Sequence, residues 1–203
     1  MATLAVSGGN TPRLMFESMA QRAFNWSGVE LFQVDERCVP PDNDQSNYRM
    51  MRESLLSAAR IPASQIHRVQ TERSPEDAAR IYAEEIRGVL KLAPAELPVF
   101  DAIQLGMGPD GHTASLFPGE RLVENRDGLA AAVWVDKFKQ HRVSLLPGVL
   151  QRAREILCLV TGADKADALR EVLGGPVDTA RFPIQLVASD AVWYIDGSAG
   201  AKL

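Results

Sequence analysis

The segment Gly106–Gly119 places four glycines, Asp110, His112 and two hydroxyl side chains directly after an apolar run. Glycines leave backbone amides uncovered, so a ligand can approach the chain closely. Asp110 can orient an exposed imidazole two residues later, and such an imidazole serves as a general base near neutral pH. A structural histidine with satisfied hydrogen bonds is the alternative, and it is the interpretation we favour for His67 and His141.

A second glycine turn, Ser7-Gly8-Gly9-Asn10-Thr11-Pro12, joins an expected strand to an expected helix. The amides of Gly8, Gly9, Asn10 and Thr11 would be open there, and a helix N-terminus carries partial positive charge. The turn therefore predicts a phosphate cradle. A plain glycine turn before a helix is the alternative.

Charged residues follow another apolar run, Leu31–Val34, in the segment Asp35–Pro40. Arg37 can bind an oxyanion through two parallel hydrogen bonds, and Asp35 is expected beside the same ligand. The alternative is a structural ion pair between Arg37 and one of the acids before it. The polar segment Asp42–Asn47 could form a rim or lid.

Two further cations stand at the start of expected elements: Arg142 opens a strand and Lys165 opens a helix. A dianionic phosphate needs local positive charge in a chain whose formal net charge is −4. Arg37, Arg142 and Lys165 are the candidates to supply it, although each would be equally ordinary as a surface residue.

Several other chemistries lack their motifs. Without GxSxG, Ser115 is not expected to be a nucleophile, and without GxxxxGK[ST] there is no nucleotide-binding loop of that type. Gly106 and Gly108 lack the third glycine of a dinucleotide fingerprint. Asp110 and His112 could supply two metal ligands, but no third is evident nearby, so no metal is expected.

Short apolar runs alternate with amphipathic segments along the chain. The expected strands are Thr3–Ser7, Leu31–Val34, Ile66–Val69, Ala102–Leu105, Ala131–Val135, Arg142–Leu146, Ile156–Thr161, Ile184–Ala188 and Val192–Ile195. The expected helices are Pro12–Phe24, Ser46–Ala59, Pro75–Leu92, Pro147–Ala153 and Lys165–Leu173. Thr11, Ser74 and Asp164 are expected to cap helices, and Gly174-Gly175-Pro176 should end the last one.

This alternation predicts an α/β fold: an open, mostly parallel twisted sheet with helices on both faces, a Rossmann-like three-layer sandwich. We expect residues 1–203 to form a single domain. Ligands bind beyond the carboxyl ends of such strands, where the three polar loops would meet. The first expected strand begins at residue 3, which leaves open that an N-terminal helix is missing.

The 203 residues are 46% hydrophobic and 24% charged, which is ordinary globular composition. The acidic balance argues against a nucleic-acid partner. Cys38 and Cys158 are far apart, which favours a reducing compartment over disulfides. With no long apolar stretch and no signal peptide, we expect a cytoplasmic chain with no membrane partner. The oligomeric state is not predicted.

Taken together, these residues resemble the 6-phosphogluconolactonases, which are related to the glucosamine-6-phosphate deaminases. The resemblance covers nearly the whole chain. It is carried by Ser7–Pro12, Asp35–Pro40, Ser46-Asn47 and Gly106–Gly119, with support from Arg142, Gly162-x-x-Lys165-Ala166 and Trp193. The deaminase relatives carry a glutamate five residues after the histidine, where this chain has Phe117. Since phenylalanine cannot exchange protons, the lactonases are the better match.

The resemblance implies hydrolysis of 6-phospho-D-glucono-1,5-lactone to 6-phospho-D-gluconate, the second step of the oxidative pentose phosphate pathway. His112 would deprotonate the attacking water, with Asp110 orienting His112 or the substrate. Amides of the Gly106–Gly119 loop would stabilise the oxyanion, and Gly108 would contact the substrate. The turn Gly8–Thr11 would hold the phosphate with the three cations. No metal or organic cofactor is implied, because an ester carbonyl is already electrophilic.

Two rival functions are a sugar-phosphate deaminase or isomerase, and a non-catalytic sugar-phosphate sensor. Phe117 argues against the first. The second should carry a helix-turn-helix segment, and the sequence shows none. Two departures from the family pattern stand out: Asn10 replaces the usual serine of the SGGSTP turn, and no helical segment is expected before the first strand.

Overall fold

The computed structural model describes residues 1–203 and contains a six-stranded sheet in the order β4-β2-β1-β5-β8-β9. All of its neighbouring strands run parallel, which confirms the expected βαβ units. The strands are β1 (Ala2–Val6), β2 (Val29–Gln33), β4 (Ile66–His67), β5 (Ala102–Gly106), β8 (Glu155–Val160) and β9 (Ala191–Ile195).

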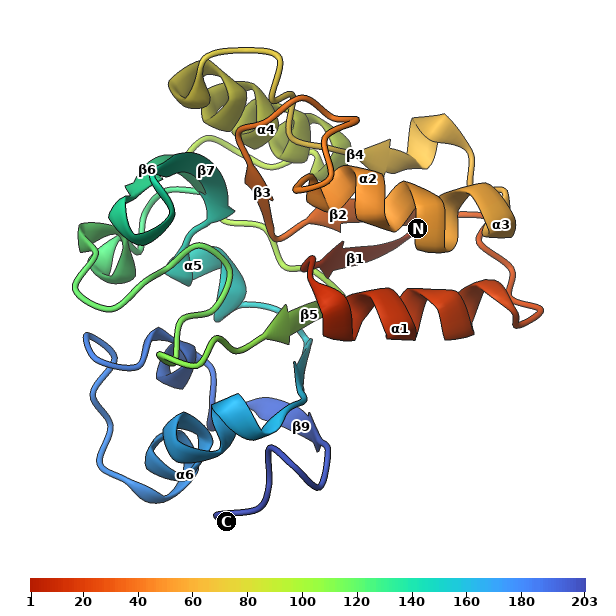
Figure 1. Cartoon of the computed structure of the whole chain (residues 1–203). Helices are drawn as coiled ribbons and strands as arrows, with labels where there is room; N and C mark the ends of the chain where they lie inside the picture. Colours follow the sequence, from red (N-terminus) through yellow and green to blue (C-terminus); the bar gives the residue numbers. More distant parts are fainter.

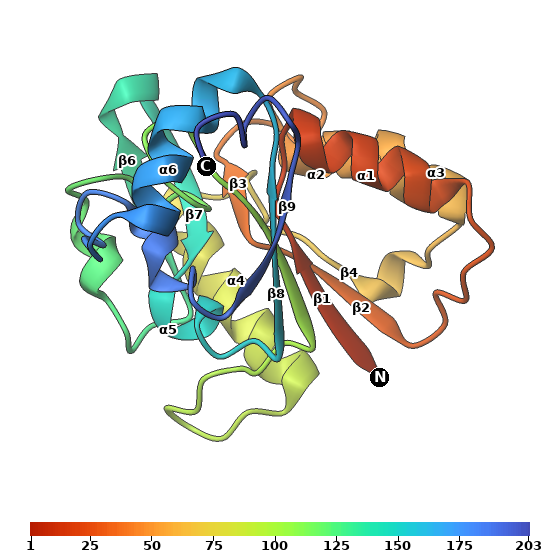
Figure 2. The same cartoon turned by 90° about the horizontal axis from the view of Figure 1, so that it is seen from below.

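Helices cover both faces of this sheet, as expected. Figure 2 shows α1, α2 and α3 on one side, and α4, α5 and α6 on the other. The helices are α1 (Asn10–Ala20), α2 (Asn47–Met51), α3 (Ser57–Ala59), α4 (Pro75–Leu90), α5 (Pro147–Leu150) and α6 (Ala166–Gly174). A π-helical turn, η1 (Arg52–Leu56), joins α2 to α3, so the expected helix 46–59 is one continuous run. No helix in the structure is both long and apolar enough to cross a membrane.

A second, antiparallel sheet was not predicted. It has three strands in the order β3-β7-β6, namely β3 (Asp35–Arg37), β7 (Gln140–Leu145) and β6 (Ala130–Val135). The β6–β7 hairpin lies on the side of the molecule opposite α1 (Figure 1). Residues 35–37 were expected in a loop, because three consecutive charged residues give no apolar strand signal.

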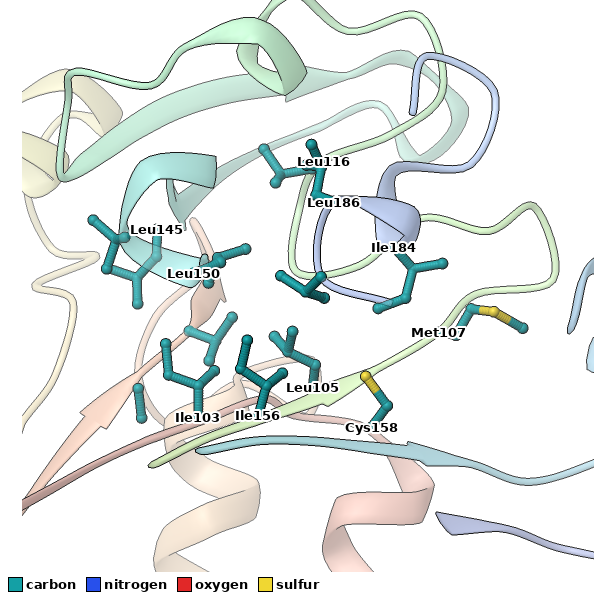
Figure 3. Close-up of a cluster of buried hydrophobic side chains, with 14 of the residues drawn as sticks. Ile103, Leu105, Met107, Leu116, Leu145, Leu150, Ile156, Cys158, Ile184 and Leu186 are labelled. Atoms are coloured by element: carbon teal, nitrogen blue, oxygen red, sulfur yellow. The ribbon is translucent and has the colours of Figure 1, made fainter. Parts of the chain in front are cut away.

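The main core fills the space between the two sheets. Figure 3 shows side chains of β5 and β8, such as Leu105 and Ile156, directed toward Leu145 of β7 and Leu150 of α5. All four are buried. A smaller core, which includes Phe16, lies between α1, α2 and the other face of the sheet. The larger core therefore fixes β5 against β7, and the loop that follows β5 starts from this fixed base.

Ile184–Ala188 was wrongly expected to be a strand. The segment forms a 3-10 helix, η6 (Pro183–Leu186). Its Ile184 N–H donates to the Gly111 carbonyl at 3.0 Å, so η6 braces the glycine loop instead of extending a sheet. An apolar run this short does not distinguish the two states.

The expected caps were right at one position and wrong at two. Ser74 caps α4 by accepting a hydrogen bond from the Asp77 N–H at 3.2 Å. Thr11 lies inside α1, whose N-cap is Gly9, and its hydroxyl bonds the Thr161 hydroxyl at 2.6 Å. Asp164 makes no capping hydrogen bond and pairs with Lys165. The glycine stop after α6 is confirmed, since the helix ends at Gly174.

Candidate active site

The carboxyl ends of three parallel strands carry the loops that were predicted to meet. Two adjoining hollows lie there and share Gly8, Gly106 and Met107. We call the first the His112 pocket; it is lined by Ser7, Gly8, Asp35, Arg37, Gly106, Met107, Gly108, His112, Ala114 and Arg142. We call the second the cradle pocket; it is lined by Gly8, Gly9, Asn10, Thr11, Pro12, Gly106, Met107, Leu159, Thr161, Asp164 and Lys165.

The structure thus gathers the residues singled out in the sequence at one place. Asp110 lines neither hollow but bonds directly to His112. The three cations are divided: Arg37 and Arg142 line the His112 pocket, and Lys165 lines the cradle pocket.

The His112 imidazole is held on two sides. Its Nδ1 lies 2.5 Å from Asp110 Oδ1, and the Phe117 ring stacks on it with a centroid separation of 4.1 Å. When Nδ1 donates to a carboxylate, Nε2 is left as the acceptor of the neutral ring. Nε2 has no protein partner, so it is free to accept a proton from a molecule in the pocket. The Phe117 ring therefore serves as a packing surface for the imidazole of His112.

Asp110 is shared between two partners. Oδ1 meets His112, and Oδ2 accepts a hydrogen bond from Lys137 Nζ at 2.9 Å. Partial burial on its own would raise the pKa of Asp110. Hydrogen bonds from His112 and Lys137, with the charge of His112, outweigh burial and hold that pKa well below its usual value. The carboxylate therefore stays ionised over the neutral range.

Gly108 leaves the space that the imidazole fills. A Cβ on Gly108 would lie 2.0 Å from His112 Nδ1 and 2.8 Å from Asp110 Oδ1. Its N–H donates to the His112 carbonyl at 2.9 Å, and the Gly111 N–H donates to the Gly108 carbonyl at 3.0 Å. Because these two N–H groups stabilise the loop itself, they are not free to bind an oxyanion as the sequence had suggested.

Strand β3 contributes both an acid and a cation. Asp35 is buried, and its Oδ2 accepts from the Ser115 hydroxyl at 2.7 Å. Ser115 is therefore engaged, in keeping with the prediction that it is not a nucleophile. Arg37 donates from Nη1 to the Gln45 carbonyl at 2.7 Å. The alternative of an ion pair between Arg37 and Asp35 or Glu36 is wrong, since both carboxylates have other partners.

Arg142 faces Arg37 across the β3–β7 ladder, and it is 7% exposed. Its guanidinium lies over the Phe138 and Phe117 rings, 4.7 Å and 5.5 Å from their centroids. Burial lowers the pKa of Arg142. The buried Nε atoms of both arginines lack a hydrogen-bond partner. Two like charges without a paired carboxylate fit a pocket that receives an anionic or strongly polar ligand.

The cradle pocket is built from backbone. No hydrogen bond within the protein uses the N–H groups of Gly8 and Gly9, and α1 begins immediately after them. Gly9 has a φ of 114°, which favours glycine. A Cβ on Gly8 would lie 1.8 Å from Asn47 Oδ1, so Gly8 must also remain glycine. Lys165 adds one charged side chain, paired in the structure with Asp164.

Glu36 has a role that the sequence did not reveal. Its buried carboxylate accepts from the Ser46 hydroxyl and from the N–H groups of Asn47 and Tyr48, so it caps α2. Burial raises the pKa of Glu36, and these hydrogen bonds oppose that rise. The segment 42–47 is thereby fixed beside β3, and nothing in its sequence spacing indicated this long-range cap.

The other residues discussed from sequence lie outside both pockets. His67 is buried between Glu30 and Glu85, at 2.8 Å from each, which confirms a structural role. His141 packs edge-on against Trp134. Burial raises the pKa of Cys38 to about 11, so this thiol is unreactive at neutral pH. No cluster of three or more histidine, cysteine or acidic side chains able to hold a metal is present.

Comparison with known proteins places this chain in a family. A profile described as "Glucosamine-6-phosphate isomerases/6-phosphogluconolactonase" matches residues 1–194. A 6-phosphogluconolactonase from Synechocystis is 36% identical, over 99% of this chain and 84% of its own.

Two solved structures extend the comparison. A 6-phosphogluconolactonase from Thermotoga maritima is similar with a TM-score of 0.83 and 34% identity, over 96% of this chain and 84% of its own. A monomeric glucosamine-6-phosphate deaminase, 18% identical, has a TM-score of 0.84 over 100% of this chain and 88% of its own, which shows a shared fold. The chain therefore belongs to the glucosamine-6-phosphate isomerase and 6-phosphogluconolactonase family.

Proposed function

We propose that the chain hydrolyses 6-phospho-D-glucono-1,5-lactone to 6-phospho-D-gluconate, with His112 as the general base. The activity named for the relatives, and their similarity over nearly the whole of this chain, support the proposal. The observation that carries the mechanism is the unpartnered Nε2 of His112 at the edge of a pocket that also holds two arginines. The reaction belongs to the oxidative pentose phosphate pathway.

In the first step, His112 Nε2 takes a proton from water as the water oxygen attacks the lactone carbonyl carbon. The imidazolium that forms is stabilised by the ionised Asp110 on its other nitrogen. The tetrahedral intermediate then collapses: the bond to the ring oxygen breaks, and that oxygen receives the proton from His112. The base is regenerated, and the product is an open chain with a carboxyl group.

The oxyanion of the intermediate is stabilised mainly by the arginines. Gly108 and Gly111 have no free N–H to offer. Arg142 and Arg37 line the same pocket as His112 and carry buried, unpartnered Nε atoms. Preorganised donors of this kind, aimed at developing charge, are worth roughly 3–4 kcal/mol each.

The phosphate occupies the cradle pocket. The free N–H groups of Gly8 and Gly9 and the first turn of α1 supply donors, and Lys165 supplies charge. The two pockets adjoin at Gly8, so one six-carbon sugar phosphate spans both.

A deaminase or isomerase is the weaker candidate. That reaction route uses an acid at the position of Phe117, and here the phenylalanine ring is stacked on His112. Nothing else in the His112 pocket replaces the missing carboxyl at this point of the loop, because Asp35 is engaged by Ser115.

We also propose that residues 1–203 act as one lactonase domain in the cytoplasm, without a metal or organic cofactor and with no nucleic-acid or membrane partner. Two free cysteines, Cys38 and Cys158, are in keeping with a reducing compartment.

The test is hydrolysis of freshly generated 6-phosphogluconolactone, corrected for spontaneous opening. Wild-type protein should exceed the spontaneous rate, and His112→Ala should lose activity by about 100-fold to 10,000-fold. Folded wild-type protein that only matches the spontaneous rate rules out the activity. A His112→Ala variant with the wild-type rate rules out the base.

A further inference from the structure

A lysine outside both pockets contacts the carboxylate that orients His112. Lys137 Nζ lies 2.9 Å from Asp110 Oδ2, while Asp110 Oδ1 lies 2.5 Å from His112 Nδ1. One oxygen of the Asp110 carboxylate is thus held by His112 of the same loop. The other is held by Lys137, which lies 27 residues away in sequence. A carboxylate held at both oxygens cannot rotate away from the imidazole without breaking a charged hydrogen bond.

The turn that carries Lys137 is itself fixed against the site. It is the 3-10 turn η4 (Asp136–Phe138) at the tip of the β6–β7 hairpin. The next residue, Phe138, contacts the Phe117 ring edge-on at 5.9 Å and lies under the Arg142 guanidinium. Lys137 Nζ in turn lies 5.6 Å from the Phe138 ring centroid. The hairpin tip therefore contacts both residues that hold His112: Lys137 binds Asp110, and Phe138 packs on Phe117.

We propose that Lys137 is a positioning residue for the lactonase reaction: by holding Asp110 Oδ2, it keeps Oδ1 on His112 Nδ1 and thereby keeps Nε2 turned toward the substrate. This inference rests on the proposed function for its kinetic consequences, but the hydrogen-bonded geometry that it describes exists without substrate.

A direct role in substrate binding fits Lys137 less well. It lines neither the His112 pocket nor the cradle pocket, and its ammonium group already donates to Asp110. The charged groups around His112 are Asp110 from its own loop, Asp35 and Arg37 from β3, and Arg142 from β7. Lys137 is the cation whose partner is the orienting carboxylate itself.

Lys139 provides a matched control. It lies on the same turn, two residues later, and pairs with Asp136 at 2.6 Å, on the exposed side of the hairpin tip. Replacing either lysine with methionine removes one positive charge and keeps an aliphatic stem. Lys137→Arg restores the charge and its donors.

We expect Lys137→Met to lower kcat at neutral pH by about tenfold, with KM within about twofold, as for loss of a group that acts only through the base. The acid limb of the pH dependence of kcat should move to higher pH by about half a unit, because a nearby positive charge is gone. Lys139→Met should match wild type, and Lys137→Arg should recover most of the loss. A rise in KM alone, or a Lys137→Met variant that matches Lys139→Met, would overturn the proposal.

A readout without substrate separates this proposal from the proposed function. In nitrogen-15 NMR spectra of the free protein, the His112 Nδ1–H signal, assigned by its loss in His112→Ala, should be protected from exchange with water in wild type and Lys139→Met. It should exchange faster in Lys137→Met, because Asp110 is released on one side. Unchanged exchange in Lys137→Met contradicts the positioning role even if the protein proves to hydrolyse another substrate.

Discussion

The two pockets of the site are built by different means. In the His112 pocket, side chains from the loop after β5 and from β7 fix one another: Asp110 holds His112, Phe117 stacks on it, and Arg142 lies over Phe117. In the cradle pocket, the donors are backbone N–H groups between the end of β1 and the start of α1. The His112 pocket therefore depends on contacts between the side chains of distant segments, whereas the backbone donors of the cradle pocket come from one local turn, with Lys165 added from a distant segment.

This difference predicts how each pocket responds to substitution. A change in the His112 pocket disturbs several packed groups at once and should lower kcat. A change in the cradle pocket should weaken binding of the phosphate and raise KM, while the base keeps its geometry. Three variants, taken from the largest expected effect to the smallest, test this contrast.

Gly108→Ala should produce the largest effect. The new Cβ would lie 2.0 Å from His112 Nδ1, so the ring must leave its place between Asp110 and Phe117. Steady-state kinetics should show kcat reduced by about 100-fold or more, comparable to loss of general base catalysis. Gly88→Ala, inside α4 with open space around it, is the control and should leave kinetics unchanged. Equal activity of the two variants would show that the pocket tolerates displacement of the imidazole.

Lys165→Met should have an intermediate effect, confined to phosphorylated substrate. Loss of a charged hydrogen bond to phosphate costs about 1.5–3 kcal/mol, which corresponds to roughly a tenfold to hundredfold rise in KM. The rate with unphosphorylated gluconolactone should not change. Lys202→Met, which removes a lysine paired with Asp167 outside both pockets, is the control. An equal loss with both lactones would remove the distinction between the pockets.

His67→Gln should leave activity unchanged and alter stability alone, which tests whether either pocket depends on this distant ion-pair cluster. Burial alone would lower the pKa of His67, but hydrogen bonds and charge from Glu85 and Glu30 raise it above its ordinary value. The folded state then binds the proton more tightly, so the stabilisation is complete below about pH 6.5 and fades as pH rises through the higher folded-state pKa.

Urea unfolding at pH 6 and pH 9 measures this effect. At pH 6, the free energy of unfolding should be larger for the wild-type protein than for His67→Gln. This difference should disappear by pH 9. A larger difference in the free energy of unfolding at pH 9 than at pH 6 would contradict the ion pairs described for His67.

The sequence predicted the cradle pocket more fully than the His112 pocket. Gly8 and Gly9 lie in one local turn between a strand and a helix, so their spacing alone indicated the open amides. Lys137 and Phe138 approach His112 only because the β6–β7 hairpin packs on the loop after β5, and no local pattern encodes that contact. The cap that Glu36 places on α2 was missed for the same reason.

The parallel sheet followed from hydrophobic periodicity, and the antiparallel sheet did not. β3 consists of three charged residues, and the carboxylates of Asp35 and Glu36 find their hydrogen-bond partners only in the assembled site. Local propensity fails at such a position, because tertiary partners replace the apolar signal. The misassigned segment Ile184–Ala188 likewise owes its conformation to contact with Gly111.

The division of the site into two pockets is tested most directly by a crystal structure with the product, 6-phosphogluconate. The phosphate should lie in the cradle pocket against the N–H groups of Gly8 and Gly9, with Lys165 beside it. The new carboxylate should lie near His112 Nε2, below Arg142. The reverse orientation, with phosphate between Arg37 and Arg142 and the carboxylate at the glycine turn, would contradict the proposed roles of both pockets.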